Sequence, residues 1–325
     1  MSAVDKIKAP IKAEMEKFEP FFRASMQTKV PLLNVIMNYI LRRKGKQMRP
    51  MFVFLTSKML QNNIEDSTYT AASLIELLHT ATLVHDDVVD ESNERRGVFS
   101  INALWKSKIS VLVGDYLLSK GLLLAVENNE YELLKIVSVA VKELSEGELL
   151  QIQHSRKLKI TEDIYYNIIR KKTAALIAAC TACGAKSTGA DDEMVEKMRV
   201  FGQYVGMAFQ IKDDLLDYQN NGSIGKPTGN DIKEKKLTLP IIHVLKNASV
   251  SDQKRILGIV KRQNKNKKKV QEVIDFVIEN GGLDYTIQKM HEYQQKALEL
   301  LKEIPEGDSK ESMIELVNYV VNRKK

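Results

Sequence analysis

Two clusters of aspartate with the same spacing are the residues of this 325-residue chain that most clearly suggest chemistry. Each cluster has the form D-D-x-x-D, and the two comprise Asp86, Asp87 and Asp90, and Asp213, Asp214 and Asp217. On an α-helix, the first and fifth positions of such a motif lie about 40° apart around the axis and about 6 Å apart along it, so both side chains point the same way. Six carboxylates in one place would repel one another unless cations bound between them.

Magnesium is the cation that suits these all-oxygen side chains. It binds to one or two carboxylates, and waters and substrate phosphates complete its shell. The alternative is that each motif is only a charged helix end. Acidic side chains at a helix C-terminus lie at the unfavourable end of the helix dipole, so that alternative leaves a cost unexplained. The motifs therefore predict a magnesium site for a phosphorylated substrate.

Long apolar helices are expected to carry both motifs. Residues 68–91 have apolar side chains at a period near 3.6 residues, and their other faces are also mostly apolar, which indicates a buried helix. Residues 194–218 have the same character. Each helix would end at its motif and place the carboxylates at the mouth of an apolar space. Strong helical patterns also cover 108–127, 130–157 and 161–185.

The composition agrees with one large helical domain. Gly and Pro are scarce, at 16 and 7 residues, and no segment sustains the alternation of a strand. Loop signals and breaks fall at 91–98, 219–231, 261–269 and near Gly281–Gly282, with amphipathic segments continuing after Pro240. Because no linker rich in Pro or Ser divides the chain, we predict a single all-α domain over residues 1–325.

Charge, hydropathy and cysteine content narrow the range of possible partners and cellular environments. A net charge of +7 suits nucleic acid, an anionic membrane or a phosphorylated molecule. We expect no nucleic acid, because no aromatic or zinc-finger motif accompanies the basic run at 261–269. We expect no signal peptide, since the N-terminus is charged throughout, and no transmembrane segment, since no charge-free apolar run reaches about 18 residues. Cys180 and Cys183 are expected to be buried, in a reducing compartment.

Basic residues suited to phosphate binding accompany the acidic motifs. Arg forms paired hydrogen bonds with phosphate oxygens, and Lys supplies a point charge. His79 lies about two turns before Asp86, on the same helix face. Each residue alone would be read as a surface charge or a core histidine, but together they are what a reaction between two diphosphates needs. The basic candidates are Lys46, Arg49, Arg95, Arg96, Lys171, Lys172, Lys226 and Lys236.

The order and spacing of these residues resemble the all-trans polyprenyl diphosphate synthases, which elongate isoprenoid chains head to tail. The resemblance covers most of the chain and is carried by GKQMRP (45–50), ExxHxATLVHDDVVDESNERRG (76–97), GDYLLS (114–119), KKTAAL (171–176), GMAFQIKDDLLD (206–217) and GKPTGNDIKEKKLTLP (225–240). It implies the isoprenoid synthase fold, a single helical bundle with a deep central cavity. Two departures are Lys44 where the family often has Gly, and Phe99 where it usually has Pro, which bears on the path of the 91–98 loop.

The resemblance also implies a role for each matching residue. Asp86 and Asp90 match the ligands of two of about three Mg²⁺ ions, and Asp87 supports them. Asp213 matches the main ligand of the third ion, with Asp214 and Asp217 in or near its shell. The residues that match the isopentenyl diphosphate site are Lys46, Arg49, His79 and Arg96. Those that match the allylic diphosphate site are Arg95, Lys172, Thr173, Gln210, Lys226 and Lys236. The residues expected to act in catalysis are Asp86, Asp87, Asp90, Asp213, Asp214 and Lys172.

The implied reaction condenses isopentenyl diphosphate with an allylic diphosphate of the farnesyl or geranylgeranyl type. Mg²⁺ and the cationic side chains stabilise the charge that develops as the allylic C–O bond breaks. Ala81 and Thr82 lie one turn before the first motif and are expected to form the floor for the growing chain, although ordinary helix packing also explains them. In the family, small residues there mark long products, so we expect an all-trans product above C20, in the range C30–C40, such as a quinone side chain.

Other functions would explain part or all of this pattern of sequence motifs. A short-chain C15 or C20 synthase shares every motif, whereas a terpene cyclase usually has an N-x-x-x-S-x-x-x-E-like second metal motif. A regulatory subunit would typically have lost acidic residues, and a basic nucleic-acid or membrane-surface protein leaves the aspartates unexplained. Family members are commonly homodimers, so we expect a cytoplasmic homodimer that contacts a membrane when it releases product.

Overall fold

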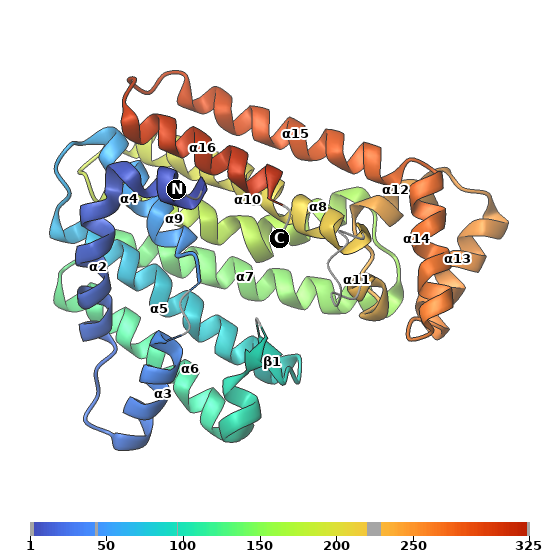
Figure 1. The fold of residues 1–325 in the computed structure, drawn as a ribbon, viewed down its shortest axis with the longest axis horizontal. Helices are drawn as coiled ribbons and strands as arrows, with labels where there is room; N and C mark the ends of the chain where they lie inside the picture. The colour runs from blue at the N-terminus through green and yellow to red at the C-terminus, as the bar shows by residue number, and fades with distance from the viewer. Residues whose placement is uncertain (1–2, 43–44, 96, 220–228, 324–325) are drawn as a thin grey trace. The chain divides into compact units, whose positions relative to one another are not determined.

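The computed structural model describes residues 3–42, 45–95, 97–219 and 229–323, with the backbone alone for Arg95. Almost all of these residues are helical (Figure 1), so the all-α class predicted from the sequence is confirmed. The helices are α1 (Ala3–Lys8), α2 (Lys12–Ser25), α3 (Pro31–Leu41), α4 (Met48–Leu60), α5 (Asp66–Val89), α6 (Ile101–Glu127), α7 (Tyr131–Lys157), α8 (Glu162–Ile169), α9 (Ala175–Lys186), α10 (Asp192–Tyr218), α11 (Asn230–Lys233), α12 (Leu239–Asn247), α13 (Val250–Arg262), α14 (Lys267–Glu279), α15 (Gly282–Leu301) and α16 (Asp308–Asn322).

The long helices predicted from the sequence are all present, with two differences. Helix α6 begins earlier than expected, because the Ser100 hydroxyl accepts a hydrogen bond from the Ala103 amide and caps the first turn. Its backbone is then interrupted at Lys106, which has a φ of 69°. The range predicted as one helix over 161–185 contains a π-helical turn, Arg170–Ala174, between α8 and α9.

A small hairpin occupies the segment that was expected to be an irregular loop. Strands β1 (Glu94–Arg95) and β2 (Val98–Phe99) pair antiparallel, with Glu94 opposite Phe99. Gly97 between them has a φ of 76°, a conformation that costs a glycine little. Two-residue strands are too short to show any alternation in the sequence, which is why none was predicted.

The chain forms two compact units, which are described separately. The first comprises Met1–Val141, Ala179–Arg199 and Glu303–Met313, and the second comprises Lys142–Ala178, Val200–Lys302 and Ile314–Lys325. Four of the five boundaries fall inside α7, α9, α10 and α16, and the fifth follows the end of α15. The first acidic motif belongs to the first unit and the second motif to the second unit.

Helices α5 and α6 pack side by side in the first unit, as the cyan and teal ribbons of Figure 1 show. Small residues of α6 allow the close approach: a Cβ on Gly121 would lie 3.3 Å from a methyl group of Leu78, and one on Gly114 would overlap the ring of His85. Burying leucine-sized side chains along such a seam contributes roughly 1.5–3 kcal/mol each. The α5 residues buried in the core are Ala71, Ala72, Leu74, Ile75, Leu77, Leu78, Ala81 and Val84.

The opposite face of α6 leaves several large apolar side chains exposed. By length and composition, α6 is also the one described helix that would suffice to cross a membrane, with 33% of its most apolar window buried. The core helix of a soluble protein meets the same criterion, so this property alone assigns α6 to neither environment.

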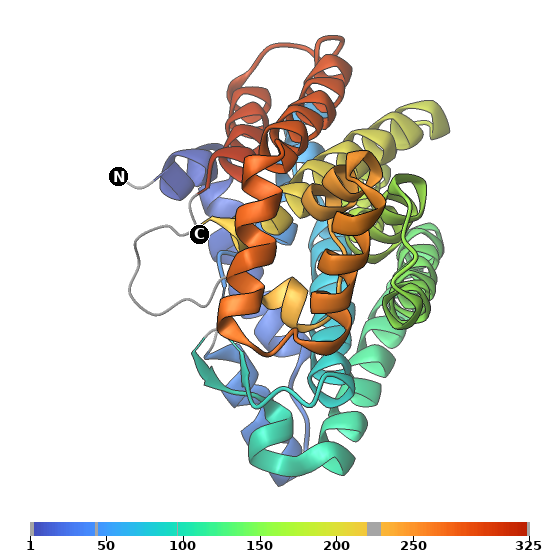
Figure 2. The same ribbon diagram turned by 90° about the vertical axis from the view of Figure 1, so that its right-hand side faces the viewer.

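The second unit contains the predicted breaks near 261–269 and 281–282. Helices α13 and α14 lie side by side at the front of Figure 2. Helix α13 ends at Arg262, and Asn266 caps α14 by accepting hydrogen bonds from the Lys268 and Lys269 amides. Helix α15 begins at Gly282, where a Cβ would lie 2.8 Å from the Pro240 carbonyl oxygen.

Both cysteines are buried and unlinked, as predicted. They lie on α9 in the first unit, and burial raises the pKa of the Cys180 thiol to about 12. A thiol with so high a pKa is a poor nucleophile and a poor metal ligand at neutral pH. The pair therefore serves packing.

Candidate active site

The first acidic motif closes α5 with its outer two aspartates on one face. The Asp90 amide donates to the Asp86 carbonyl over 2.8 Å, so Asp90 keeps the helical register at the C-cap position. Asp86 is half-buried and Asp90 is exposed. Asp87 is only 4% exposed, and its carbonyl accepts from the Ser92 amide and the Asn102 side chain. The arrangement directs two carboxylates outward, one turn apart, and one inward.

The hairpin that follows the motif is held at its base by short hydrogen bonds. The Ser100 hydroxyl donates to the Ser92 carbonyl over 2.6 Å, and the Tyr39 hydroxyl donates to the Phe99 carbonyl over 2.6 Å. Phe99 therefore lies in β2 with its own side chain exposed. The side chain of Arg95 and all of Arg96 lie outside the described residues.

The described residues predicted to bind isopentenyl diphosphate come from adjoining helices of the first unit. Lys46 is exposed in the loop before α4, Arg49 lies in the first turn of α4, and His79 lies on α5, which packs against α4. Between Lys46 and Arg49, Gln47 has a φ of 53° and turns the chain into α4. The charge of Arg49 lowers the pKa of the buried Cys180 thiol and the charge of Glu76 raises it, so both side chains lie near that thiol. The Arg49 charge therefore lies near the α5 turn that precedes His79.

The middle aspartate of the second motif is the centre of a hydrogen-bonded chain in the second unit. Asp214 is 4% exposed and accepts from the Tyr165 hydroxyl over 2.6 Å and from the Gln210 amide over 2.9 Å. The Thr173 hydroxyl donates to the Gln210 side-chain oxygen over 2.7 Å. Burial raises the pKa of Asp214 to about 7, against the opposing effect of these donors. Three predicted site residues, Thr173, Gln210 and Asp214, are thus joined.

The last aspartate of the motif organises the chain after α10. Asp217 Oδ1 accepts from the Asn230 amide over 3.0 Å, and Oδ2 accepts from the Asp231 amide over 2.9 Å. Partial burial and the negative charges of Asp214 and Asp217 raise the pKa of Asp231 to about 8. Each carboxylate oxygen keeps a further lone pair, so the arrangement leaves Asp217 able to contact a metal ion.

Asp213 differs from its neighbours because a cationic side chain contacts it. Arg323 donates from Nη2 to Asp213 Oδ1 over 2.5 Å, and the side chain of Asp213 remains 39% exposed. Arg323 follows α16 at the end of the described chain. The pairing spans 110 positions of sequence, and nothing in the local pattern of either segment indicates it.

Lys172, whose amine is predicted to bind the allylic diphosphate, lies in the π-helical turn between α8 and α9. Its Nζ is 2.5 Å from Glu148 Oε2 and 3.3 Å from Gln151 Oε1, both on α7. Glycines let the turn approach its neighbours: a Cβ on Gly147 of α7 would lie 2.8 Å from the Lys172 amide nitrogen, and one on Gly206 of α10 would lie 2.5 Å from the Ala174 Cα. This close packing fixes Lys172 and Thr173 beside α7 and α10.

Several functional candidates are only partly described, and others were missed. Lys236 is half-buried, and its Nζ is 2.5 Å from Glu234 Oε2, whereas Lys226 lies outside the described residues. Tyr165, Asp231 and Arg323 contact the second motif but were not predicted. Asp231 stands inside the GKPTGNDIKEKK segment, so its position was a usable signal. Tyr165 is 49 residues from Asp214 and has no such signal.

The described aspartates suit a magnesium ion whose other ligands come mainly from the substrate. No group of three or more acidic, histidine or cysteine side chains already forms a metal-binding cluster in the described part of the chain. Mg²⁺ that keeps its waters and phosphate ligands needs only one or two carboxylates. Asp86 and Asp90 provide two outward carboxylates one turn apart, and Asp213 provides an accessible one in the other unit. The donor set is therefore suitable for this ion.

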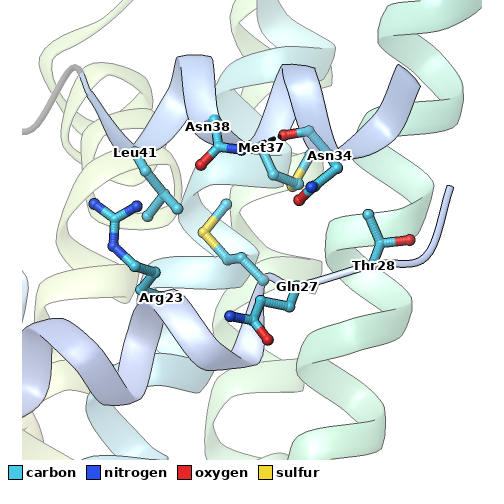
Figure 3. Close-up of a pocket in the computed structure, with 8 residues that line it drawn as sticks. Arg23, Gln27, Thr28, Asn34, Met37, Asn38 and Leu41 are labelled. Atoms are coloured by element: carbon cyan, nitrogen blue, oxygen red, sulfur yellow. Dashed lines mark hydrogen bonds between the residues drawn. The ribbon is translucent and has the colours of Figure 1, made fainter. Parts of the chain in front are cut away.

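The pocket in Figure 3 lies elsewhere in the first unit, between α2 and α3. It has a volume of about 320 Å³ and is lined by Arg23, Met26, Gln27, Thr28, Asn34, Met37, Asn38 and Leu41. None of these residues belongs to the motifs found in the sequence. Its lining contains one cation and no acid, and we give it no part in the chemistry.

Comparison with known proteins identifies the relatives of this chain. A family model described as polyprenyl synthetase matches residues 30–277. An all-trans-nonaprenyl-diphosphate synthase (geranyl-diphosphate specific) of Rhodobacter capsulatus is 35% identical, over 98% of this chain and 97% of the relative. A polyprenyl synthase structure from Caulobacter crescentus, complexed with calcium and isoprenyl diphosphate, matches with a TM-score of 0.90 at 32% identity, over 99% and 98% of the two chains. A geranylgeranyl pyrophosphate synthase structure from Bacteroides thetaiotaomicron matches with a TM-score of 0.85 at 37% identity, over 99% and 100%.

Proposed function

Because the chain belongs to the polyprenyl synthetase family, it is a polyprenyl diphosphate synthase, and we propose that it makes an all-trans product longer than C20 by successive additions of isopentenyl diphosphate. The observation that carries the proposal is the pair of D-D-x-x-D motifs, each ending a long helix with an accessible carboxylate. The nonaprenyl-forming relative supports the long product. The similarity to a geranylgeranyl pyrophosphate synthase makes a C20 product the second candidate.

In the proposed mechanism, Asp86, Asp90 and Asp213 would hold about three Mg²⁺ ions, with Asp217 in or near the shell of the ion at Asp213. When bound, these ions would neutralise the diphosphate as its charge increases. The related structure that contains calcium and isoprenyl diphosphate supports a divalent ion beside this class of ligand.

The cationic side chains orient the two substrates. Lys172 donates to the allylic diphosphate in place of its present contacts with Glu148 and Gln151, and Gln210 is held in position by Thr173 and Asp214. As the allylic C–O bond breaks, its electron pair leaves with the diphosphate, which Lys172 stabilises. The isopentenyl double bond forms the new C–C bond, and the proton then lost passes to the departed diphosphate.

The buried face of α5 supplies the apolar surroundings that the allylic cation requires. Leu74, Leu77, Leu78 and Ala81 are all at most 2% exposed, so water has little access along this face. Excluding water prevents hydrolysis of the cation. We propose that Ala81, with Thr82 beside it, limits the length of the chain that grows along α5.

Replacing Ala81 with Phe should shorten the longest product. Ala81 is fully buried, so the added ring would have to extend along α5 into the path that we propose for the growing chain. Purified protein is incubated with Mg²⁺, labelled isopentenyl diphosphate and farnesyl diphosphate, and the dephosphorylated products are separated by chromatography. Ala81→Leu serves as a graded variant and should shorten the product less.

The same assay distinguishes failure of the floor assignment from failure of the proposed function. If wild-type protein elongates farnesyl diphosphate beyond C20 but folded Ala81→Phe protein makes equally long products, only the floor assignment is wrong. Release of hydrocarbon without chain growth, or a wild-type product that stops at C20, would contradict the proposed function.

The exposed face of α6 supports a homodimer. Five apolar side chains on it are between 41% and 58% exposed: Val111, Leu112, Leu122, Leu123 and Val126. Their spacing aligns them along one side of the helix, opposite the face that packs on α5. An exposed apolar stripe of this kind on a long helix suits a two-fold interface with a second copy. Such a cytoplasmic dimer would contact a membrane only when it delivers its water-insoluble product.

The double substitution of Leu112 and Leu123 with Glu should convert the dimer into a monomer. Charged side chains on both sides of a two-fold interface would repel and remain unpaired. Sedimentation velocity measures the mass, and Val250→Glu, at a 67% exposed site on α13, is the control. A wild-type monomer, or a double variant that remains dimeric, would contradict the proposed interface.

A further inference from the structure

Arg323, the last described residue of the chain, contacts the second acidic motif. The guanidinium of Arg323 donates to Asp213 Oδ1 over 2.5 Å, and its carbon lies 4.1 Å from the centre of the Phe209 ring, one turn before Asp213 on α10. Its Nε donates to the Val320 carbonyl over 3.3 Å. The side chain is 15% exposed, so the contact is largely shielded from water. A carboxylate and an aromatic face thus form one cradle for the guanidinium.

The other two aspartates of the motif are satisfied differently. Asp214 accepts from the neutral hydroxyl of Tyr165 and the amide of Gln210, and Asp217 accepts from two backbone amides. All four of these donors are neutral, so none of them offsets the negative charge of the carboxylate that it contacts. At Asp213 the arginine supplies a full positive charge beside a carboxylate that is predicted to bind a metal ion.

The Arg323 guanidinium places a positive charge directly at this carboxylate, whose side chain remains 39% exposed. A divalent ion approaching Asp213 would meet electrostatic repulsion from Arg323, whose guanidinium lies at one of the two carboxylate oxygens.

We propose that Arg323 is a positioning residue that holds Asp213 in the metal-free protein and is displaced when a divalent ion binds there. This inference rests on the proposed function, because it takes Asp213 to be a metal ligand. Displacement breaks the contact at Asp213 and frees the Arg323 side chain, while the buried Val317, Val320 and Val321 keep α16 in place. The guanidinium competes with a divalent ion for Asp213. It therefore weakens metal binding until the ion arrives together with a diphosphate that also binds the ion.

Metal binding without substrate tests the proposal directly. Mn²⁺ is titrated into the full chain, and free Mn²⁺ is followed by electron paramagnetic resonance. Arg323→Gln should bind Mn²⁺ about tenfold more tightly than wild type, because it removes both the competitor and its charge. Arg323→Lys keeps the charge without the fork and should fall between the two.

Arg255→Gln is the matched control, because Arg255 also pairs with carboxylates, Asp252 and Glu272, and lies over an aromatic ring, Phe276. It should leave Mn²⁺ affinity unchanged. Thermal melts of all variants confirm folding. An Arg323→Gln protein that binds Mn²⁺ no more tightly than wild type, or does not bind it at all, overturns the proposal.

A second variant and a second readout separate this inference from the proposed function. Asp213→Asn should remove one Mn²⁺ site, and if it does not, the metal assignment itself fails. If Asp213→Asn loses the site but Arg323→Gln leaves affinity unchanged, only the role of Arg323 fails. In wild type, hydrogen exchange of the Arg323 amide, which donates to the Tyr319 carbonyl, should increase when Mn²⁺ saturates the protein, and an unchanged exchange rate contradicts the displacement of Arg323.

Discussion

Replacing Asp86 with Asn should lower kcat/KM for chain elongation by about a thousandfold. The substitution keeps the shape of the side chain but removes one of the two outward charges at the end of α5. A metal ligand that has lost its charge no longer holds the ion against the substrate diphosphate. Initial rates of labelled isopentenyl incorporation, measured over a range of Mg²⁺ concentrations, provide the test.

Glu91→Gln is the control for this prediction. Glu91 is an exposed acid one position beyond the motif, and its neutralisation should change the rate by no more than about twofold. If Asp86→Asn retained more than a tenth of the wild-type activity at saturating Mg²⁺, Asp86 would not be a principal metal ligand. Equal losses in both variants would point to a general effect of negative charge.

Replacing Lys172 with Gln should reduce kcat/KM for the allylic substrate by about a hundredfold. The Lys172 side chain is 31% exposed in the π-helical turn, where its amine contacts Glu148 and Gln151 and can turn to a bound diphosphate. Loss of its charge should raise KM for the allylic diphosphate and also lower kcat, because the leaving group gains charge in the transition state. Steady-state kinetics with varied farnesyl diphosphate separates the two parameters.

Lys171→Gln is a closely matched control. Lys171 lies in the same turn and also pairs with an α7 carboxylate, Glu146, so its replacement breaks an equivalent ion pair. Lys171 is one of the basic candidates in the sequence, but the family resemblance assigns it to neither diphosphate site. We expect activity within about threefold of wild type. Similar losses in both variants would mean that the contacts with α7 matter for structure and that Lys172 does not bind the substrate.

The sequence was sufficient to locate the helices that carry the two motifs. The apolar periodicity of 68–91 and 194–218 predicted α5 and α10, because a buried helix must show this pattern along its own length. The spacing within D-D-x-x-D likewise placed Asp86 and Asp90 on one face. These features depend only on residues that are neighbours in the chain.

Part of the surroundings of the second motif could not be predicted, because it depends on residues that are distant in the chain. Tyr165 and Arg323 reach Asp214 and Asp213 across 49 and 110 positions, and neither has a distinctive local pattern. The π-helical turn at 170–174 was also missed. Its packing depends on glycines of two other helices, Gly147 and Gly206, which the pattern of 161–185 does not contain.

A crystal structure of the protein with Mn²⁺ and a non-ionisable thiolo analogue of farnesyl diphosphate would test most directly whether the two motifs share one metal cluster. Anomalous scattering from Mn²⁺ would locate each ion. The account predicts ions bound to Asp86 and Asp90 and another bound to Asp213, all contacting the same diphosphate. Ions at one motif alone, or two motifs too far apart for one diphosphate to bridge, would contradict it.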